Sequence, residues 1–268
     1  MSVPAEFPTV SALVLAGKRD GRLDPLAQKA GVALKCLVPV AGKALIAHVV
    51  EALEKCPEIG GIWIVAGQEY EIERALADAG VGATKPRRYV EPSLNIVDSV
   101  LAGAGQIDGP IMITTADNVL LTPATVAEFV AGAAEAAGGG AVAMARREAV
   151  LAVHPEGQRR FYHFTDGEFS NCNLYWIGSK RALRAAETFR AGGQFVKFPM
   201  RIARAFGLVN LLRFKLGVGS TETFFGSVGR RFGFPVRQVV VSDGAAAIDV
   251  DNERSHKVAE RILLQRQG

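Results

Sequence analysis

The sequence predicts an α/β fold with a doubly wound, mostly parallel sheet. Short apolar runs alternate with longer helical segments through the first half of the 268 residues. The apolar runs show little polar alternation, as expected when helices cover both faces of a parallel sheet. Hydrophobic residues make up 49% of the chain and charged residues 22%, a balance that favours a folded core over disorder.

The elements of the first half follow in order along the chain. We predict strands at residues 10–16, 61–66 and 110–115, and helices at residues 43–55, 69–79 and 95–104. Another helix should begin at Pro123, because Thr122 is a good N-cap and proline suits the first helical position. Three glycines at residues 138–140 should end it before the apolar residues 141–145.

The second half departs from this regular alternation. We predict a strand at residues 171–177, a helix at 179–189, strands at 236–241 and 245–250, and a closing helix at 252–265 capped by Asn252. Residues 193–233 are rich in Phe, Leu, Arg and Lys and contain several glycines, which indicates a helical insertion without strands. The sequence therefore predicts a single domain over residues 1–268 that carries this insertion.

The net charge of +4 comes from basic residues that gather in local groups around residues 18–22, 85–88, 146–160 and 197–231. Such groups suit phosphorylated small molecules. No aromatic-and-basic stacking pattern recurs, so we expect no nucleic-acid partner. Cys36, Cys56 and Cys172 lack paired spacing, and neither a leader pattern nor a membrane-length apolar run is present. We therefore expect reduced thiols in a cytoplasmic protein.

Residues 197–216 combine basic and apolar side chains in a way that suits the surface of an anionic membrane. Peripheral membrane contact through this segment would fit a phosphorylated substrate that is a lipid precursor. The alternatives are a lid over the site and a contact between subunits, each with the apolar side buried. The sequence does not indicate an oligomeric state.

The first predicted strand leads into a basic loop with two glycines, Gly17 and Gly21. A loop between a buried strand and a helix presents unpaired backbone N–H groups, and glycine lets that backbone approach an anion closely. The spacing matches neither the P-loop nor the dinucleotide fingerprint. The loop alone is therefore compatible with phosphate binding and also with solvated surface charges.

A second basic segment follows this loop. Together they form a strand, a Leu-Ala-Gly turn, a basic loop with an arginine, and a segment with two lysines before a helix. The residues of this pattern are Leu15, Ala16, Gly17, Arg22, Lys35, Leu37, residues 39–43, Leu45 and Ile46. The pattern resembles that of the nucleotidyltransferases. The chain is similar to the sugar-1-phosphate nucleotidyltransferases and to relatives of the molybdenum cofactor guanylyltransferase, and the resemblance implies a Rossmann-like fold.

The resemblance also implies roles for these residues. Lys35 would neutralise charge at the reacting α-phosphate, and Arg22 would hold the triphosphate, because fixed cations stabilise developing charge in such transfers. Other nucleotide contacts would come from Leu15, Ala16, Gly17, Lys18, Arg19 and Gly21. The loop is slightly longer than the family pattern, and Lys18 stands where many members have glycine. Lys18, Arg19 and Arg22 therefore remain alternatives for the role of the arginine.

Two acidic segments resemble the metal ligands of the same family. Asp117 follows an apolar strand, at the edge where open α/β sheets place their ligands, and its family counterpart binds Mg²⁺. Ala116 stands in place of the family's glycine. A later segment implies Asp249 as the second ligand, with Asp251 as the alternative. Mg²⁺ takes one or two carboxylates together with water and phosphate oxygens, so Asp117, Asp249 and a triphosphate would complete a site.

Two further segments resemble those that line the base and the acceptor. Asn95 and Ser99 lie four residues apart on a predicted helix and can point the same way, so the resemblance implies contact with the nucleobase. A helix cap and a small packing residue are the alternative roles of this pair. Asn171 and Asn173 resemble the strand that lines the acceptor side, where Asn173 replaces a glycine.

The resemblance implies an Mg²⁺-dependent enzyme. It would transfer a nucleoside monophosphate from a nucleoside triphosphate to a phosphorylated small-molecule or lipid-precursor acceptor and release pyrophosphate. Positioning and charge neutralisation suffice for this reaction. The alternative is a catalytically inactive nucleotide-binding regulatory or scaffold protein of the same fold, suggested by the longer loop, Ala116 and Asn173.

Overall fold

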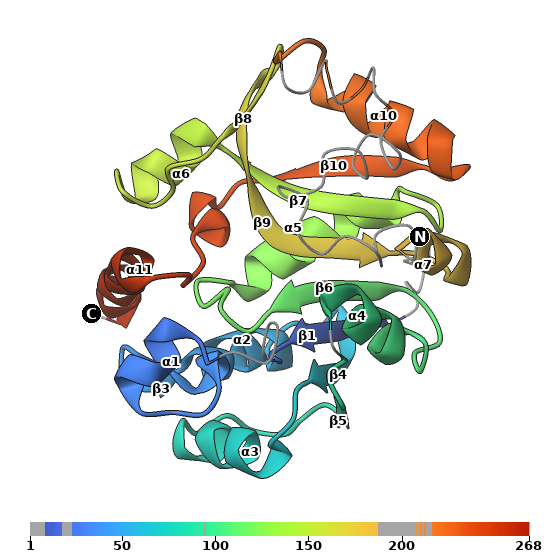
Figure 1. Ribbon diagram of the computed structural model, residues 1–268. Helices are drawn as coiled ribbons and strands as arrows, with labels where there is room; N and C mark the ends of the chain where they lie inside the picture. The colour runs from blue at the N-terminus through green and yellow to red at the C-terminus, as the bar shows by residue number, and fades with distance from the viewer. Residues whose placement is uncertain are drawn as a thin grey trace, which may run out of the picture.

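The computed structural model describes residues 9–17, 23–93, 95–186, 207, 210, 212 and 216–267. The strands of its main sheet are β1 (Val10–Leu15), β4 (Ile59–Val65), β5 (Arg87–Val90), β6 (Ile111–Thr115), β7 (Gly140–Arg146), β8 (Tyr162–Phe164), β9 (Gly167–Ile177) and β10 (Val236–Val241). Their order is β10-β7-β9-β6-β1-β4-β5, with β8 paired to β9 (Figure 1).

This sheet is mostly parallel, as the sequence predicts. The pairs β1–β4, β1–β6, β4–β5 and β7–β10 are parallel, whereas β9 runs antiparallel to β6, β7 and β8. A separate small hairpin joins β2 (Pro39–Val40) to β3 (Lys43–Ala44). The hairpin explains why the helix predicted from residue 43 begins two residues later.

Helices cover both faces of the sheet. The larger core cluster involves α2 (Leu45–Glu54), α3 (Glu69–Asp78), α5 (Pro123–Ala134) and α11 (Glu253–Gln267). The opposite face packs against α4 (Ile96–Ala104), α7 (Lys180–Ala186) and α10 (Thr221–Phe232). Along β1, Ala12 and Val14 join the first cluster and Leu13 the second, because successive strand residues point to opposite faces.

The structure confirms the two helix caps that were predicted from the sequence. Thr122 accepts a hydrogen bond from the backbone of Thr125 and begins α5, and Asn252 accepts bonds at the start of α11. Short elements were missed: the sequence analysis did not predict α1 (Pro25–Ala30), β5, α6 (Arg147–Val153) or β8.

One predicted strand is wrong. Residues 245–250 contain no strand; instead the 3-10 helix η4 (Gly244–Ala247) forms there, and Asp243 caps it by accepting a bond from Ala245 N at 2.8 Å. A short apolar run cannot be assigned to strand or helix by periodicity alone. The preceding aspartate was the signal for a helical turn.

The parallel strands end level with one another, so their following loops share one edge. Leu15 pairs with Val65 and Thr115, and Val65 pairs with Val90. The loop after β1 comes so close to the next loops that a Cβ on Gly17 would lie 2.9 Å from Pro92. In Figure 1 this edge lies on the left, beside α1 and α11. Open α/β sheets bind ligands at this edge.

The segment between β10 and α11 crosses the same edge. Val250 N donates a 3.0 Å hydrogen bond to the carbonyl oxygen of Asp117, which joins this segment to the end of β6. His256 Nε2 lies 2.7 Å from Pro39 O, and Arg266 donates to Leu120 O at 2.9 Å. The C-terminal part of the chain is thereby fixed against loops from the first half.

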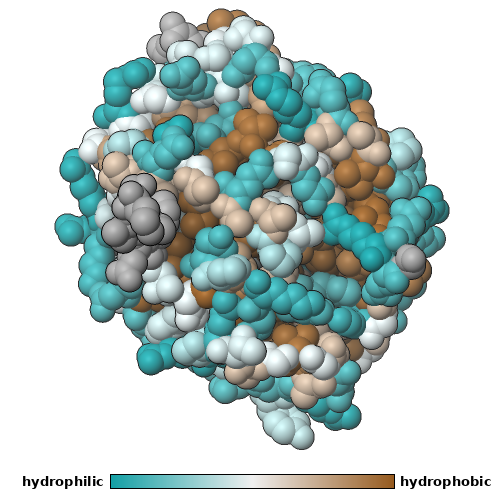
Figure 2. Space-filling model, turned by 180° about the vertical axis from the view of Figure 1, so that it is seen from behind, coloured by the Kyte–Doolittle hydropathy of each residue, from teal (hydrophilic) through white to brown (hydrophobic). Residues whose placement is uncertain are grey.

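Some predicted features fall largely outside the described residues. Of the insertion at 193–233, the structure describes residues 207, 210, 212 and 216–233, where α10 forms after the cap Ser220. Most of the segment 197–216, with its predicted membrane contact, is not described. Among the described helices, none has the length and apolar character needed to cross a membrane. On the face shown in Figure 2, hydrophobic side chains form separate patches between hydrophilic ones.

The three cysteines are free and buried. Burial raises the pKa of Cys36 and Cys56 to about 12, so these thiols stay protonated at neutral pH. This agrees with the expectation of reduced core thiols, while the cytoplasmic location itself stays a prediction.

Replacing Gly244 by alanine should destabilise the fold. A Cβ at this position would lie 2.3 Å from the carbonyl carbon of Ala149, and only a backbone shift could relieve the clash. We expect the free energy of unfolding, measured with urea, to fall by about 2–3 kcal/mol. Gly82→Ala is the control, because Gly82 is exposed and its nearest neighbour would be 4.0 Å away. Equal stability of the two variants would contradict the close packing of η4 on α6.

Candidate active site

Three carboxylates meet at the ligand-binding edge of the sheet. Asp117 follows β6, while Asp249 and Asp251 follow η4, and one oxygen from each lies within 4.8 Å of the others. Because Val250 is bonded to the backbone of Asp117, the two flanking aspartates are brought to the end of β6. The sequence analysis named Asp117 and Asp249 and kept Asp251 as an alternative; the structure brings all three together.

Lys35 supplies the positive charge of this cluster. It begins η1 (Lys35–Leu37), and its Nζ lies 2.6 Å from Asp117 Oδ2 and 3.1 Å from Asp251 Oδ1. Burial by itself lowers the pKa of Lys35, but the charges and hydrogen bonds of Asp117 and Asp251 outweigh this effect and raise the pKa above its usual value. Lys35 therefore remains a cation at neutral pH, held beside the carboxylates.

Asn173 holds the third carboxylate from the opposite side. Its Nδ2 donates to Asp249 Oδ2 at 3.2 Å, and its backbone has φ = +50°. Asparagine tolerates this left-handed conformation better than most residues, which explains how it can replace the family's glycine. Asn171 accepts a bond from Asn173 N at 3.1 Å and donates to the hydroxyl of Tyr175 at 2.5 Å. Asn173 therefore contacts a carboxylate of the cluster, and Asn171 is joined to it through Asn173; their contact with an acceptor stays a prediction.

Burial and neighbouring charges disfavour the ionised form of Asp249. Burial, followed by the charges of Asp251 and Asp117, raises the pKa of Asp249 to about 7. Without a further cation, the folded protein therefore binds a proton on this side chain more tightly than the unfolded chain does. Lys35 contacts the other two carboxylates but has no bond to Asp249.

The carboxylates fit a divalent metal ion. Asp117 Oδ1 is buried and has no hydrogen-bond partner among the described residues, so it leaves a free acceptor inside the cluster. With all three carboxylates ionised and Lys35 protonated, the cluster carries two negative charges, which a divalent cation would balance. Mg²⁺ prefers such oxygen ligands and completes its shell with water and phosphate oxygens.

The structure describes only part of the predicted nucleotide loop. Leu15, Ala16 and Gly17 lie at the sheet edge, where Ala116 N donates to Leu15 O at 3.0 Å. This bond places the start of the loop beside the residue before Asp117. The other predicted contacts lie outside the described residues and stay predictions: Lys18, Arg19, Gly21 and Arg22.

Asn95 and Ser99 make local hydrogen bonds. Asn95 caps α4 by accepting a bond from Asp98 N at 2.9 Å, and the buried Ser99 Oγ accepts a bond from Ser93 N at 2.9 Å. These contacts are those of a helix cap and a packing residue, which the sequence analysis kept as the alternative roles. Contact with a nucleobase stays a prediction.

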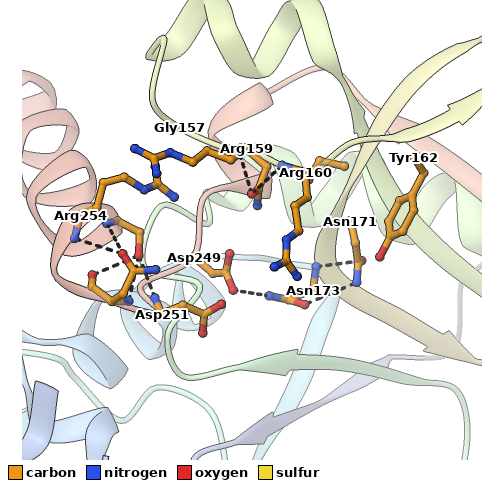
Figure 3. A pocket seen from close by; sticks show the side chains of 13 residues that line it. Gly157, Arg159, Arg160, Tyr162, Asn171, Asn173, Asp249, Asp251 and Arg254 are labelled. Atoms are coloured by element: carbon orange, nitrogen blue, oxygen red, sulfur yellow. Dashed lines mark hydrogen bonds between the residues drawn. The ribbon is translucent and has the colours of Figure 1, made fainter. Parts of the chain in front are cut away.

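A cavity of about 740 Å³ opens beside the carboxylates (Figure 3). It is lined by residues 157–160, Tyr162, residues 170, 171 and 173, and residues 249, 251, 252, 254 and 255. The sequence analysis did not name Arg159, Arg160 or Arg254 as site residues. Two of them belong to the basic group at residues 146–160, which was the available signal, but nothing in the sequence indicated that this loop faces the three carboxylates.

A model of a known family matches more than half of the chain. A family model described as a MobA-like NTP transferase domain matches residues 12–205. The chain belongs to this family. The matched region includes Lys35 and Asp117 and ends before Asp249 and Asp251, so the structure alone places those two aspartates with the rest. A search of curated proteins found no match.

Solved structures share the fold. A hypothetical transferase from Thermus thermophilus has a TM-score of 0.76 and 23% identity, over 93% of this chain and 100% of that one. A 4-diphosphocytidyl-2C-methyl-D-erythritol synthase from Anaerococcus prevotii has a TM-score of 0.58 and 12% identity, with coverage of 95% and 96%. A CMP:2-keto-3-deoxy-manno-octonic acid synthetase complexed with CTP has a TM-score of 0.56 and 12% identity, with coverage of 96% and 99%. At these identities the likeness establishes the Rossmann-like nucleotidyltransferase fold.

Replacing Asp249 by asparagine should stabilise the metal-free protein at alkaline pH. Because the folded state raises the pKa of Asp249 from 3.8 to about 7, it binds this proton more tightly than the unfolded chain does. The resulting stabilisation is complete below pH 3.8 and is lost as the pH rises through about 7. In urea unfolding with EDTA, the variant should exceed the wild type by about 1–3 kcal/mol at pH 8 and by much less at pH 4.

The exposed Asp78→Asn substitution on α3 is the control and should leave both stabilities unchanged. A variant of Asp249 that is no more stable than the wild type at pH 8 would show that the carboxylates do not repel one another as the geometry indicates.

Proposed function

We propose that the protein transfers a nucleoside monophosphate from a nucleoside triphosphate to a phosphorylated acceptor and releases pyrophosphate. The observation that carries this proposal is the contact of Lys35 with Asp117 inside a cluster of three carboxylates, at the ligand-binding edge of the sheet. Membership of an NTP transferase family supports the reaction class. The CTP bound in one structural neighbour is consistent with a nucleotide donor.

Each charged residue has a distinct part in this proposal. Asp117, Asp249 and Asp251 would hold Mg²⁺, which when bound would neutralise phosphate oxygens and fix the orientation of the triphosphate. Lys35, protonated and half-buried, would stabilise negative charge at the reacting phosphate. The loop after β1 would hold the triphosphate through its backbone N–H groups and one of Lys18, Arg19 and Arg22.

The acceptor would enter from the cavity beside β9. Asn171 and Asn173 line this cavity together with Asp249, and their amide groups could hydrogen-bond acceptor hydroxyls there. The acceptor's phosphate oxygen would then attack the α-phosphate while pyrophosphate leaves, and no covalent enzyme intermediate is needed. A soluble sugar phosphate and a lipid precursor share this chemistry, and residues 197–216 are the segment where a lipid precursor would make its membrane contact.

The reaction can be tested by pyrophosphate release. Purified protein with Mg²⁺ is incubated with each of CTP, GTP, UTP and ATP and a panel of sugar and polyol phosphates. At least one pair should give metal-dependent pyrophosphate, and Asp117→Asn should lower its rate by at least about 100-fold, because it removes a charged ligand from the cluster. The control is Asp108→Asn, whose side chain is 94% exposed and paired with Lys180. It should retain the wild-type rate.

Two results would contradict the proposal. One is pyrophosphate release that does not respond to Asp117→Asn, since the carboxylates would then have no part in the reaction. The other is tight nucleotide binding with no pyrophosphate from any pair, which would favour the inactive nucleotide-binding protein. Thermal shift with each triphosphate and Mg²⁺ separates this second result from a failure to bind, because bound nucleotide stabilises the folded state.

A further inference from the structure

We propose that Arg160 binds the oxyanion group of the acceptor and thereby selects anionic acceptors. This inference rests on the proposed nucleotidyl transfer, because it assigns the acceptor-binding cation of that same site. Arg160 lies in the loop between α6 and β8, directly before Phe161. No motif in the sequence analysis singled it out.

Figure 3 shows the Arg160 side chain extending into the cavity toward Asp249 and Asn173. Its guanidinium has no ion pair or hydrogen bond with any residue that the structure describes. A guanidinium presents five N–H donors in a planar fork, which matches the oxygens of a phosphate or carboxylate. Arg160 therefore offers an unused anion-binding group that faces the metal ligands.

The other two arginines of the cavity are engaged elsewhere. Arg254 Nη1 donates to the backbone oxygen of Glu156, and Arg159 lies 3.9 Å from the carboxylate of Glu156. In Figure 3 Arg159 and Arg254 extend toward each other at the side of the cavity away from Asn173. Arg160 is thus the cavity arginine whose charge is directed at Asp249.

The backbone of Arg160 is fixed relative to Asp249. A Cβ on Gly157 would lie 2.6 Å from Ile248 Cδ1, so the loop packs directly on the residue before Asp249. Gln158 strengthens this contact: its Nε2 lies 3.4 Å from Ala247 O, and its Oε1 accepts a bond from Arg160 N at 3.4 Å. The loop and the metal-ligand segment therefore form one packed unit.

Phe161 fixes the other end of the loop. It packs against the larger core cluster, and the Arg147 guanidinium lies 5.6 Å from the centre of its ring. Because the residue after Arg160 is anchored, the arginine projects into the cavity from a defined point. A preorganised cation binds an anion at a lower entropic cost than one on a free loop.

Electrostatics explain why an anionic acceptor needs this arginine. The triphosphate and the three carboxylates all repel an incoming anion, and Lys35 is already held by Asp117 and Asp251. Of the three arginines that line the cavity, Arg160 is the one that extends toward Asp249 and Asn173 (Figure 3). Its position beside Asp249 would hold the oxyanion next to the metal, where its oxygen can face the α-phosphate.

The direct test is chemical modification of arginines in the full-length protein. Phenylglyoxal reacts with accessible guanidinium groups, and tandem mass spectrometry resolves Arg160 from Arg159. With inorganic phosphate at about ten times its dissociation constant, the modification of Arg160 should slow by about tenfold, while that of Arg159 changes little. Acetate is the second probe: stronger protection by acetate than by phosphate would support the anion site and assign it to carboxylate acceptors.

Two outcomes would overturn the inference. Unchanged modification of Arg160 with both anions would show that it binds neither. Equal protection by CTP and Mg²⁺ without added anion would assign Arg160 to the triphosphate instead of the acceptor. The experiment needs no turnover, so protection by phosphate together with an absence of pyrophosphate release would reject the proposed reaction and leave the anion site standing.

Kinetics give an independent measurement on any acceptor that releases pyrophosphate. Arg160→Gln should raise the KM for the acceptor by about 10–100-fold and leave the KM for the nucleotide unchanged, because it removes one charged contact to the acceptor. Arg74→Gln, on the exposed surface of α3, is the matched control and should leave both constants unchanged. A parallel rise in the nucleotide KM would contradict the assignment to the acceptor.

Discussion

The hydrogen bond from Val250 N to the carbonyl oxygen of Asp117 is the constraint on which the site depends. It joins the end of a central strand to a segment more than a hundred residues later, and so brings Asp249 and Asp251 to Asp117. The fold thereby concentrates like charges that repel one another. Lys35 offsets part of this repulsion because it contacts Asp117 and Asp251. The repulsion that it does not offset, together with burial, raises the pKa of Asp249. A cation bound between the three carboxylates would relieve the repulsion among them.

The segment that carries Asp249 and Asp251 also fixes the loop that lines the cavity. Close packing of Gly244 on α6 and of Gly157 on Ile248 ties the loop before β8 to the segment that carries the aspartates. Asn173 completes the arrangement from β9 by bonding Asp249. The cavity, the carboxylates and Arg160 are therefore parts of one rigid arrangement, in which acceptor and metal would be positioned by the same backbone contacts. We expect changes in this packing to weaken the binding of the metal and the binding of the acceptor together.

The sequence predicted the parts that depend on local pattern. Buried parallel strands, the caps Thr122 and Asn252, and Asp117 after the end of β6 all leave a local trace. What the sequence did not predict depends on contacts between distant segments. η4 was taken as a strand because a short apolar run fits both structures. Arg160 was missed because its place at the cavity comes from the packing of Gly157 and Gln158 on residues 247 and 248. Asp251 was only an alternative, since the spacing could not show that both aspartates reach Asp117.

The central claim is that Asp117, Asp249 and Asp251 hold a divalent cation at the end of β6. Anomalous diffraction from crystals grown with Mn²⁺ and CTP tests it most directly. The account predicts a single strong peak about 2.1 Å from carboxylate oxygens of Asp117, Asp249 and Asp251, with Lys35 beside the phosphates. A peak elsewhere, or Lys35 still bridging Asp117 and Asp251 with no metal between the carboxylates, would contradict it.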